Sequence, residues 1–526
     1  MRRGAPHRRR HRLLQRRRVP ARPARGDRGD LPMTNLVRRL VDTAADRGWM
    51  ERPAYFVDED VHRYEDVYAG AARAAAAYAS RGLGPGARIL LALPDGIEFV
   101  RAFLGALHIG AVAVPVNSML HPDEMRRAAD IARPAVVVSV PEFAERFAVP
   151  VLTPDVLDCD GPVPAYAPCT TDTPAFAAFT SGTTGGPKLC FHTHGDPEIL
   201  SRAAGAAVGV GPDDVSYSVP RMNFAYGLGN SLFFSLLSGG STVLTPRRLA
   251  PGDSLAVLER YGVSVFYSQP TFFAHMLGHP DAARILGGLR VAVVAGEVLP
   301  ESLERTLRGI LGPRLLNVYG TTEIGHALLA NGPGEMREFT LGRVLPPYRL
   351  RVVGDDGEAA APGVEGRLEV SGPTIGLGVP HGDAAPVRLA ADQWYSTSDA
   401  ATMDADGFVR VHGRLDDVEI VGGVNVHPTE IEDRLMAHPA VEEAAVCAVR
   451  QDTGISVLRA YAVLRDPLDS AAAEALRGEL LLAAADSLTW YKVPHDITFV
   501  ARLPRNPTGK LLRRTIRALA AEDSLR

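Results

Sequence analysis

The chain of 526 residues contains few cysteines, few lysines and no long apolar segment. Its four cysteines are Cys159, Cys169, Cys190 and Cys447, and no two of them form a C-x-x-C pair. Neither a zinc site nor a disulfide framework is therefore expected, and a reducing, cytoplasmic location is favoured. The longest apolar stretch, residues 102–116, contains a histidine and is shorter than the roughly 18–20 residues of a membrane span, which excludes a transmembrane protein.

The charge of the chain is unevenly distributed. Hydrophobic residues make up 46% and charged residues 22%, as in globular proteins, and the length predicts at least two domains because one core rarely exceeds roughly 250–300 residues. Residues 1–32 contain 12 Arg and 2 Asp, a net charge of +10, so that with a total of -4 the rest of the chain carries -14. An acidic body disfavours nucleic acid as a partner. We expect residues 1–32 to be a disordered basic extension, either upstream of a true start at Met33 or able to bind an anion.

Lysine is scarce in a chain rich in other basic residues. Of 57 basic residues, only Lys188, Lys492 and Lys510 are lysine. A lysine provides a compact ammonium, which the planar guanidinium of arginine cannot replace in a tight site. The three lysines are therefore candidate functional residues, with chance retention on the surface as the alternative.

Short aliphatic runs alternate with helical stretches along most of the chain. Runs at residues 89–93, 111–116, 134–140, 241–244, 263–268 and 291–295 predict the strands of parallel α/β layers. Around residues 341–370 the pattern changes to short strands separated by Gly and Pro turns, which indicates a β-rich subdomain. Beyond residue 417, a helix at 428–437 and strands near 441–449 and 460–463 predict a small α+β domain.

The strongest motif is Phe-Thr-Ser-Gly-Thr-Thr-Gly-Gly-Pro-Lys at residues 179–188. Its three glycines, four hydroxyl side chains and one lysine can surround a polyphosphate with backbone N–H groups, hydroxyls and an ammonium. It is not a Walker A loop, because Pro187, Lys188 and Leu189 stand where that motif requires Gly-Lys-Ser/Thr. A flexible linker is the alternative, which Lys188 and the following Phe-His-Thr-His at 191–194 disfavour.

Four further segments follow this loop in order: residues 317–323, 395–399, 413–428 and 506–510. Together the five segments resemble those of the adenylate-forming superfamily, which includes acyl-CoA synthetases, luciferases and the adenylation domains of peptide synthetases. The resemblance implies an α/β fold with a large N-terminal domain, residues 33–413, made of two layered α/β subdomains and a β-rich subdomain. A hinge at 414–417 around Asp416 and a small mobile α+β domain at 418–526 would follow.

The resemblance also implies roles for individual residues. Lys188, Thr180, Glu323 and Lys510 would be catalytic, and Glu323 would bind Mg²⁺. Tyr319 would stack on adenine, and Asp399 would accept hydrogen bonds from the ribose. The implied ATP-binding residues are Thr180, Ser181, Gly182, Thr183, Thr184, Lys188, Gly296, Glu297, Asn317, Tyr319, Gly320, Thr321, Thr322, Asp399, Arg414 and Lys510. Gly422, Gly423, Val424 and Asn425 would line the thiol pathway. Ser398 and Leu189 depart from the family pattern, which has glycine at both positions, and residues 376–381 lack the expected Gly-Tyr.

The segment Asn-Phe-Ala-Tyr-Gly-Leu-Gly-Asn at 223–230 resembles the corresponding stretch of benzoate–CoA ligases. The implied acid pocket consists of Phe224, Ala225, Tyr226, Gly320, Gly325, His326 and Ala327, with ordinary core packing as the alternative. Siderophore-type aryl-acid activators have an asparagine at the position of Ala225, which contacts the 2-hydroxyl of salicylate-like acids. A methyl group cannot bond a hydroxyl, so we expect benzoate or a modestly substituted benzoate rather than salicylate. The same resemblance implies extra room for a ring substituent, because Ala327 takes the place of a larger aliphatic residue in the benzoate ligases.

The expected function is therefore an ATP-dependent aryl-acid–thiol ligase. The thiol is coenzyme A or the phosphopantetheine of an acyl carrier protein, and nothing in the sequence separates the two. There are two alternatives. One is another carboxylic acid–CoA ligase, and the other is a luciferase-like oxidoreductase that passes the adenylate to a non-thiol acceptor. A catalytically inactive scaffold is disfavoured because Glu323 and Lys510 are both present. A monomer and a homodimer are both compatible with the sequence.

Overall fold

The computed structural model of the chain describes residues 35–120, 122–158, 161–181, 187–332, 336–354, 356–379, 385–415, 419–421, 424–426, 428–450, 456–488, 490–505 and 511–523. The basic arm with Met33 and the predicted site residues Gly182, Thr183, Thr184, Asp416, Gly422, Gly423 and Lys510 lie outside these ranges. The structure describes the backbone but not the side chains of Ser181, Arg414, Val424 and Asn425.

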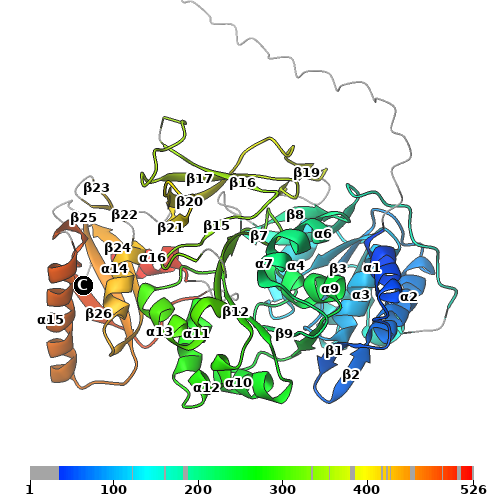
Figure 1. Ribbon diagram of the computed structural model, residues 1–526, viewed down its shortest axis with the longest axis horizontal. Coiled ribbons are helices and arrows are strands. Elements are labelled where there is room, and N and C mark those ends of the chain that lie inside the picture. Colours follow the sequence, from blue (N-terminus) through cyan, green and yellow to red (C-terminus); the bar gives the residue numbers. More distant parts are fainter. Residues whose placement is uncertain are drawn as a thin grey trace, which may run out of the picture.

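The largest sheet of the described residues has the strand order β15-β14-β13-β12-β11-β9-β10-β1-β2 (Figure 1). Its central strands are parallel, and the edge strands β2, β14 and β15 are antiparallel to their neighbours. The bounds are β1 Pro53–Val57, β2 Asp60–Arg63, β9 Val215–Ser218, β10 Ser241–Leu244, β11 Val265–Ser268, β12 Val291–Val294, β13 Leu315–Gly320, β14 Ala327–Asn331 and β15 Arg343–Val344. Because parallel strands need crossover connections, helices such as α10 (Pro251–Arg260), α11 (Pro270–Leu277) and α13 (Glu301–Leu311) cover the sheet.

A second sheet has the order β6-β5-β3-β4-β7-β8. Its strands are β3 Arg88–Ala92, β4 Val112–Pro115, β5 Val136–Ser139, β6 Val151–Leu152, β7 Pro174–Ser181 and β8 Pro187–Thr193. The last two form an antiparallel hairpin whose connection is the predicted phosphate loop. The helices of this half include α1 (Leu36–Asp46), α2 (Tyr64–Ala79), α3 (Ile97–His108) and α4 (Pro122–Ala132). The two sheets are the layered α/β subdomains that the aliphatic runs predict.

The apolar stretch at residues 102–116 is divided between a helix and a strand. Helix α3 ends at His108 and β4 begins at Val112. Gly110 lies between them with a φ of 71°, a left-handed conformation that ends the helix at little steric cost. Phe103 on α3 packs against Phe176 of β7 and against Phe233, with ring centroids 5.9 and 6.0 Å apart. Helix α3 is apolar because it is buried inside the protein. Within the described ranges, every helix is too short or too polar to span a bilayer.

A third sheet and the C-terminal elements complete the chain (Figure 1). The third sheet contains β16 (Arg349–Val353), β17 (Gly366–Ser371), β20 (Tyr395–Met403) and β21 (Val409–Arg414), as expected for the β-rich subdomain. The C-terminal elements are β22 (Glu419–Val421), β23 (Val424–Val426), α14 (Pro428–Met436), β24 (Val441–Arg450), β25 (Ser456–Leu464), α15 (Ser470–Ser487), β26 (Asp496–Phe499) and α16 (Arg513–Asp523). Their buried side chains, from Val426 to Ala520, form cores of their own. The expected α/β fold with a large N-terminal and a small α+β C-terminal unit is confirmed.

Candidate active site

The β7–β8 hairpin places two predicted site residues opposite each other at the base of the phosphate loop. Thr180 of β7 pairs with Lys188 of β8 in the antiparallel register. A third segment packs on this pair, since a Cβ added to Gly378 would lie 3.0 Å from Lys188 Cβ and 3.1 Å from Thr180 Cγ2. Leu189, one of the departures from the family pattern, is buried and exchanges two backbone hydrogen bonds with Val379. These contacts bring the segment before residue 380 against the base of the loop.

Glu323 reaches the same place from the other sheet. It follows β13, and its Oε1 accepts a hydrogen bond of 2.9 Å from Thr180 Oγ1. A carboxylate beside a hydroxyl is a donor set that suits a hard cation. In the described part of the chain, no group of three or more His, Cys, Asp and Glu side chains could hold a metal ion. A cation at Glu323 would therefore need oxygens from a bound phosphate, which is how proteins usually bind Mg²⁺.

Tyr319 and Asp399 form a second polar pair, four residues before Glu323 on the Tyr319 side. The Tyr319 hydroxyl donates to Asp399 Oδ2. Asp399 lies opposite Arg414 in the β20–β21 register, so that their backbones are neighbours. Ser398, which stands where the family has glycine, has a φ of 62°. The position thus requires the left-handed conformation that glycine adopts most easily, and the serine adopts it here at some cost.

Two buried oxygen atoms in the predicted ATP-binding segment have no hydrogen-bond partner within the described residues. They are Asn317 Oδ1 and Thr321 Oγ1. Leaving such an atom unpaired costs about 1–3 kcal/mol. Both residues belong to the segment that the resemblance assigns to ATP binding.

The C-terminal elements reach the rim of this site through polar contacts. Arg505 Nη2 lies 3.1 Å from Glu443 of β24, and its Nη1 lies 3.8 Å from Oε1 of Glu297, which follows Gly296 after β12. The other oxygen of Glu297 accepts a hydrogen bond of 2.6 Å from Thr271 Oγ1. Arg505 also forms an isolated backbone bridge with Leu511. Arg505 and Leu511, which flank the predicted Lys510 segment, are thus backbone neighbours, and the Arg505 side chain lies near Glu297.

Two further contacts join the C-terminal elements to the N-terminal ones. His275 Nε2 lies 3.1 Å from Glu442 Oε1. Helix α14 faces α13, where burial together with the negative charges of Glu432 and Glu301 raises the pKa of Asp433 to about 7. This part of the boundary therefore holds carboxyl groups of like charge close together.

Lys492 does not belong to this site. Its Nζ donates to both carboxylate oxygens of Glu430, at 2.8 and 2.6 Å, within the C-terminal unit. Lys492 is therefore assigned a structural role, as one partner of an ion pair, rather than a role in the site. Lys188 is the one described lysine that lies at the base of the phosphate loop.

The predicted acid-pocket residues gather around His326. Helix α8 (Ala225–Leu228) begins after Phe224, and its first residue, Ala225, is buried. The Tyr226 ring lies 4.7 Å from the His326 ring, and Phe234 lies 4.6 Å from it on an edge. Close packing requires glycine nearby, because a Cβ on Gly229 would lie 2.2 Å from His326 Cδ2. This cluster is apolar except for the Tyr226 hydroxyl and the ring nitrogens of His326.

The electrostatics of this cluster favour an uncharged ring. Burial lowers the pKa of His326 to about 3, so its imidazole is neutral at pH 7. His326 Nε2 lies 2.9 Å from Asn230 Oδ1, and Asn230 Nδ2 donates to Ser218 Oγ at 3.2 Å. Asn230 was missed as a site residue, although it ends the segment that indicates the pocket. Its partner lies 96 positions away, and no local pattern marks that contact.

Two family models match the chain. One, described as "AMP-binding enzyme", matches residues 41–379, and the other, "AMP-binding enzyme C-terminal domain", matches residues 430–510. The chain belongs to the AMP-binding enzymes. This family assignment agrees with the adenylate-forming resemblance of the five sequence segments.

Relatives of this AMP-binding enzyme include ligases of aryl acids. The p-hydroxybenzoic acid–AMP ligase of Mycobacterium tuberculosis is 39% identical over 92% of this chain and 68% of its own length. The benzoate–CoA ligase of Thauera aromatica is 33% identical over 89% of this chain and 92% of its own. Among solved structures, an anthranilate CoA ligase in complex with anthranoyl-AMP has a TM-score of 0.86 at 26% identity, covering 94% of this chain and 99% of that one. A benzoate CoA ligase from Burkholderia xenovorans has a TM-score of 0.82 at 29% identity, covering 92% and 99%.

The buried His326 predicts acid sensitivity of this AMP-binding enzyme. Its pKa is about 3 in the folded chain against 6.5 when unperturbed, so the unfolded chain binds a proton more readily between these values. The stability that its neutral form provides is complete above pH 6.5 and is lost as the pH falls toward 3. Between about pH 7.5 and pH 5 the free energy of unfolding should fall by about 2 kcal/mol on this account.

His326→Gln keeps an amide that can donate to Asn230 but removes the titration. We expect its free energy of unfolding, measured by urea denaturation at both pH values, to fall less than that of the wild type by about 2 kcal/mol. An equal fall in both proteins would mean that His326 is not held neutral.

Proposed function

We propose that this AMP-binding enzyme is an ATP-dependent aryl-acid–thiol ligase that activates benzoate or a substituted benzoate as an acyl-adenylate. One observation carries the proposal. The loop after β13 holds Glu323, bonded to Thr180 at the base of the phosphate loop, and three residues later His326, packed against Tyr226. A polar site for phosphates and an uncharged site for a ring therefore adjoin on one loop. The names of the relatives, which act on benzoate and p-hydroxybenzoic acid, support the same acid class.

ATP would lie between the phosphate loop and the Tyr319–Asp399 pair. Lys188, Thr180 and the hydroxyls of Ser181, Thr183 and Thr184 would bind its phosphates, and Arg414 would act beside Asp399 at the ribose. Asn317 and Thr321 would belong to the segment that contacts the nucleotide. Gly296 and Glu297 would line the edge of the adenine, with Gly320 and Thr322 completing the site. Glu323 would hold Mg²⁺, which when bound neutralises charge on the phosphate oxygens.

The reaction requires charge neutralisation rather than a general base. A benzoic acid is already ionised at pH 7, so its carboxylate oxygen can attack the α-phosphorus directly. Repulsion between two anions is the main barrier, and the ammonium groups of Lys188 and Lys510 would lower it as charge develops. The products are an acyl-adenylate and pyrophosphate, and a thiol then displaces AMP.

The acid would bind with its ring among Phe224, Ala225, Tyr226, Gly325, His326 and Ala327. These positions offer a neutral imidazole and apolar surfaces, which suit an aromatic ring better than a charged substituent. Phe224 would guard the side that faces ATP. The alanine at position 327 leaves room for a substituent.

The matched benzoate–CoA ligases belong to the ATP-dependent CoA ligases. These enzymes use ATP, Mg²⁺ and coenzyme A. For this chain, coenzyme A is the proposed acceptor, reached along Gly422, Gly423, Val424 and Asn425 after rotation at Asp416. The phosphopantetheine of an acyl carrier protein carries the same thiol. Steady-state AMP release with coenzyme A, with a holo-carrier protein and with neither separates the two acceptors from a non-thiol reaction. Cytoplasmic location is part of the proposal and agrees with Cys169, Cys190 and Cys447 being free thiols.

The first prediction from this function concerns ring substituents. ATP–pyrophosphate exchange should be faster with benzoate and 4-hydroxybenzoate than with salicylate, in kcat/KM, on the order of tenfold or more, because the 2-hydroxyl is buried without a partner. Ala225→Asn should narrow that difference by supplying an amide. Ala225→Leu, which has the same branched arrangement of side-chain heavy atoms but no amide, is the control and should not narrow it. A wild type that prefers salicylate would mean that Ala225 does not line the acid pocket. A wild type that shows no ATP–pyrophosphate exchange with any aryl acid would contradict the proposed function.

The second prediction concerns Lys510. Lys510→Ala should slow adenylation about 10²–10³-fold, as expected for loss of a main charge-stabilising donor, yet leave thioester formation from synthetic benzoyl-adenylate nearly unchanged. Lys510→Arg should be almost as slow, because a forked guanidinium cannot replace a compact ammonium. The matched control is Lys492→Ala, which removes the lysine paired with Glu430 and should leave both half-reactions unchanged. Equal loss in both half-reactions after Lys510→Ala would contradict a domain rotation between them.

A further inference from the structure

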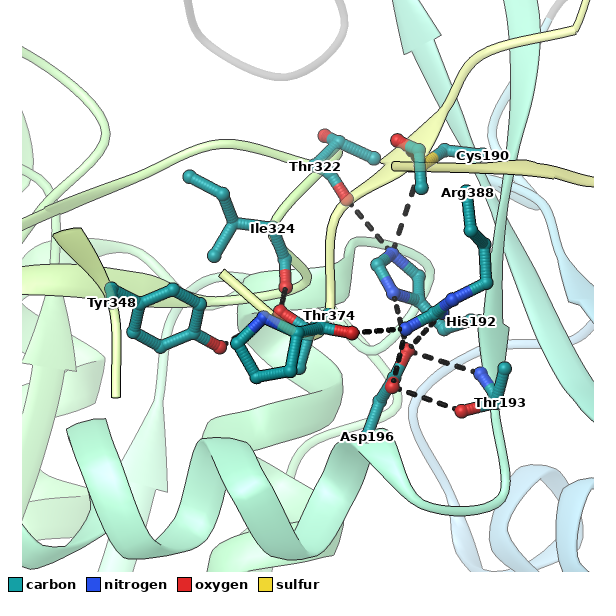
Figure 2. A network of polar contacts seen from close by, with 11 residues as sticks. Cys190, His192, Thr193, Asp196, Thr322, Ile324, Tyr348, Thr374 and Arg388 are labelled. Atoms are coloured by element: carbon teal, nitrogen blue, oxygen red, sulfur yellow. Dashed lines mark hydrogen bonds and ion pairs between the residues drawn. The ribbon is translucent and has the colours of Figure 1, made fainter. Parts of the chain in front are cut away.

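The backbone beside Glu323 is held by buried hydrogen-bond donors at three successive carbonyl groups. Thr322 O lies 2.9 Å from His192 Nε2, and Ile324 O accepts a hydrogen bond of 2.7 Å from Thr374 Oγ1 (Figure 2). Between them, Glu323 O accepts a hydrogen bond of 2.9 Å from the backbone N–H of Gly376. The loop therefore has little freedom on either side of Glu323.

His192 must carry a proton on Nε2 in this arrangement. A carbonyl oxygen such as Thr322 O only accepts hydrogen bonds, so the ring nitrogen that faces it is the donor. The ring is wholly buried on β8 and stacks on Phe176, with centroids 5.0 Å apart. Gly325 closes on it from the loop, since an added Cβ there would lie 3.0 Å from His192 Cε1. The imidazole thus fills the space behind residues 322–325.

A buried carboxylate fixes the orientation of this ring. Asp196 Oδ2 lies 3.2 Å from His192 Nδ1 (Figure 2). Arg388 binds both oxygens of Asp196, at 2.7 and 2.9 Å, and also donates to Pro373 O at 2.7 Å. Although burial raises the pKa of Asp196, hydrogen bonds from His192 and Arg388 outweigh it and hold that pKa below its usual value. Arg388 therefore ties the strand that carries His192 to the segment that contains Thr374 and Gly376.

The neighbouring cysteine does not make this a nucleophilic site. Cys190 Sγ lies 3.8 Å from His192 Nε2, but it donates to Gly376 O at 3.0 Å. Burial raises the pKa of the Cys190 thiol well above its usual value, so the sulfur is protonated. Cys190, His192 and Asp196 are all almost completely buried. The group is built to hold backbone rather than to attack a substrate.

We propose that His192, oriented by Asp196, is a positioning residue that fixes the Thr322–Glu323 peptide and thereby the carboxylate that would hold Mg²⁺ with ATP. This role rests on the proposed function. The carboxylate is set from two ends, by Thr180 at Oε1 and by the anchored backbone behind it. Removing the donor at His192 would let the peptide rotate and would move the carboxylate away from the phosphates. Groups behind a metal ligand commonly change metal affinity by roughly 10–100-fold when removed.

The test measures binding without turnover. The affinity for ATP is determined by calorimetry with and without Mg²⁺, in the absence of any acid, and the gain due to Mg²⁺ is compared between variants. His192→Phe keeps the ring but removes both nitrogens, and it should reduce that gain by about 10-fold or more. His192→Gln, whose amide nitrogen can take the place of Nε2, should keep the gain within a few-fold. His192→Asn reaches only the position of Nδ1 and should resemble His192→Phe.

His194→Phe is the matched control. His194 lies two residues further along and is equally buried, but its Nδ1 accepts from the backbone N–H of Leu36 at 3.1 Å, far from the loop after β13 in sequence. The His194→Phe substitution should lower the melting temperature without changing the gain in ATP affinity that Mg²⁺ provides. Equal gains in His192→Phe, His194→Phe and the wild type would overturn the positioning role, as would equal gains in the Gln and Asn variants. A wild type with no gain from Mg²⁺ and no pyrophosphate exchange with aryl acids would overturn the proposed function itself.

Discussion

The hydrogen bond between Thr180 and Glu323 connects the two large sheets of the protein. Thr180 lies on β7 of one sheet, and Glu323 follows β13 of the other, so the bond forms only where the ends of these strands meet. The other parts of the candidate site are arranged around that meeting point. Lys188 is paired with Thr180 across the hairpin, and His326 lies three residues beyond Glu323. The relative placement of the two sheets therefore decides the geometry of the site.

The sequence predicts the parts of the site that are short and contiguous. The loop at 179–188 and the segment at 317–323 carry their residue types within a few positions, so composition and resemblance suffice to find them. The strands were predictable for a similar reason, because buried parallel strands are continuous aliphatic runs. Ser398 shows a limit of such reading. The resemblance marks it as a departure from glycine, but only the backbone shows that the left-handed conformation is kept.

Contacts between distant segments could not be predicted. Arg388 and Asp196 are 192 positions apart, and neither has a local pattern that indicates the other. His192 was visible only as part of Phe-His-Thr-His after the phosphate loop, where it could equally have been a core residue. The positioning role proposed for His192 depends on its hydrogen bond to a backbone carbonyl group. Every residue has such a group, so no sequence pattern indicates it. The contact of Arg505 with Glu297 likewise depends on how the C-terminal unit meets the rest, which no motif specifies.

Two of the described contacts between the C-terminal unit and the rest of the chain are individually weak. The pairs Arg505–Glu297 and His275–Glu442 are partly exposed, and such ion pairs contribute roughly 0–1 kcal/mol each. Asp433 and Glu301 add like charges at the same boundary. Such contacts can be broken and remade at little cost in free energy. They are suited to a protein whose two half-reactions are proposed to use different faces of the C-terminal unit.

The scarcity of lysine also limits the number of sites at which a lysine-specific protease can cleave the chain. An endoproteinase that cuts only after lysine has three target bonds in the 526 residues, at Lys188, Lys492 and Lys510. The first lies within the β7–β8 hairpin, where Leu189 is buried and paired with Val379. Cleavage there requires the strands around the phosphate loop to separate. The folded enzyme is therefore shielded at this bond by the same pairing that sets Thr180 opposite Lys188.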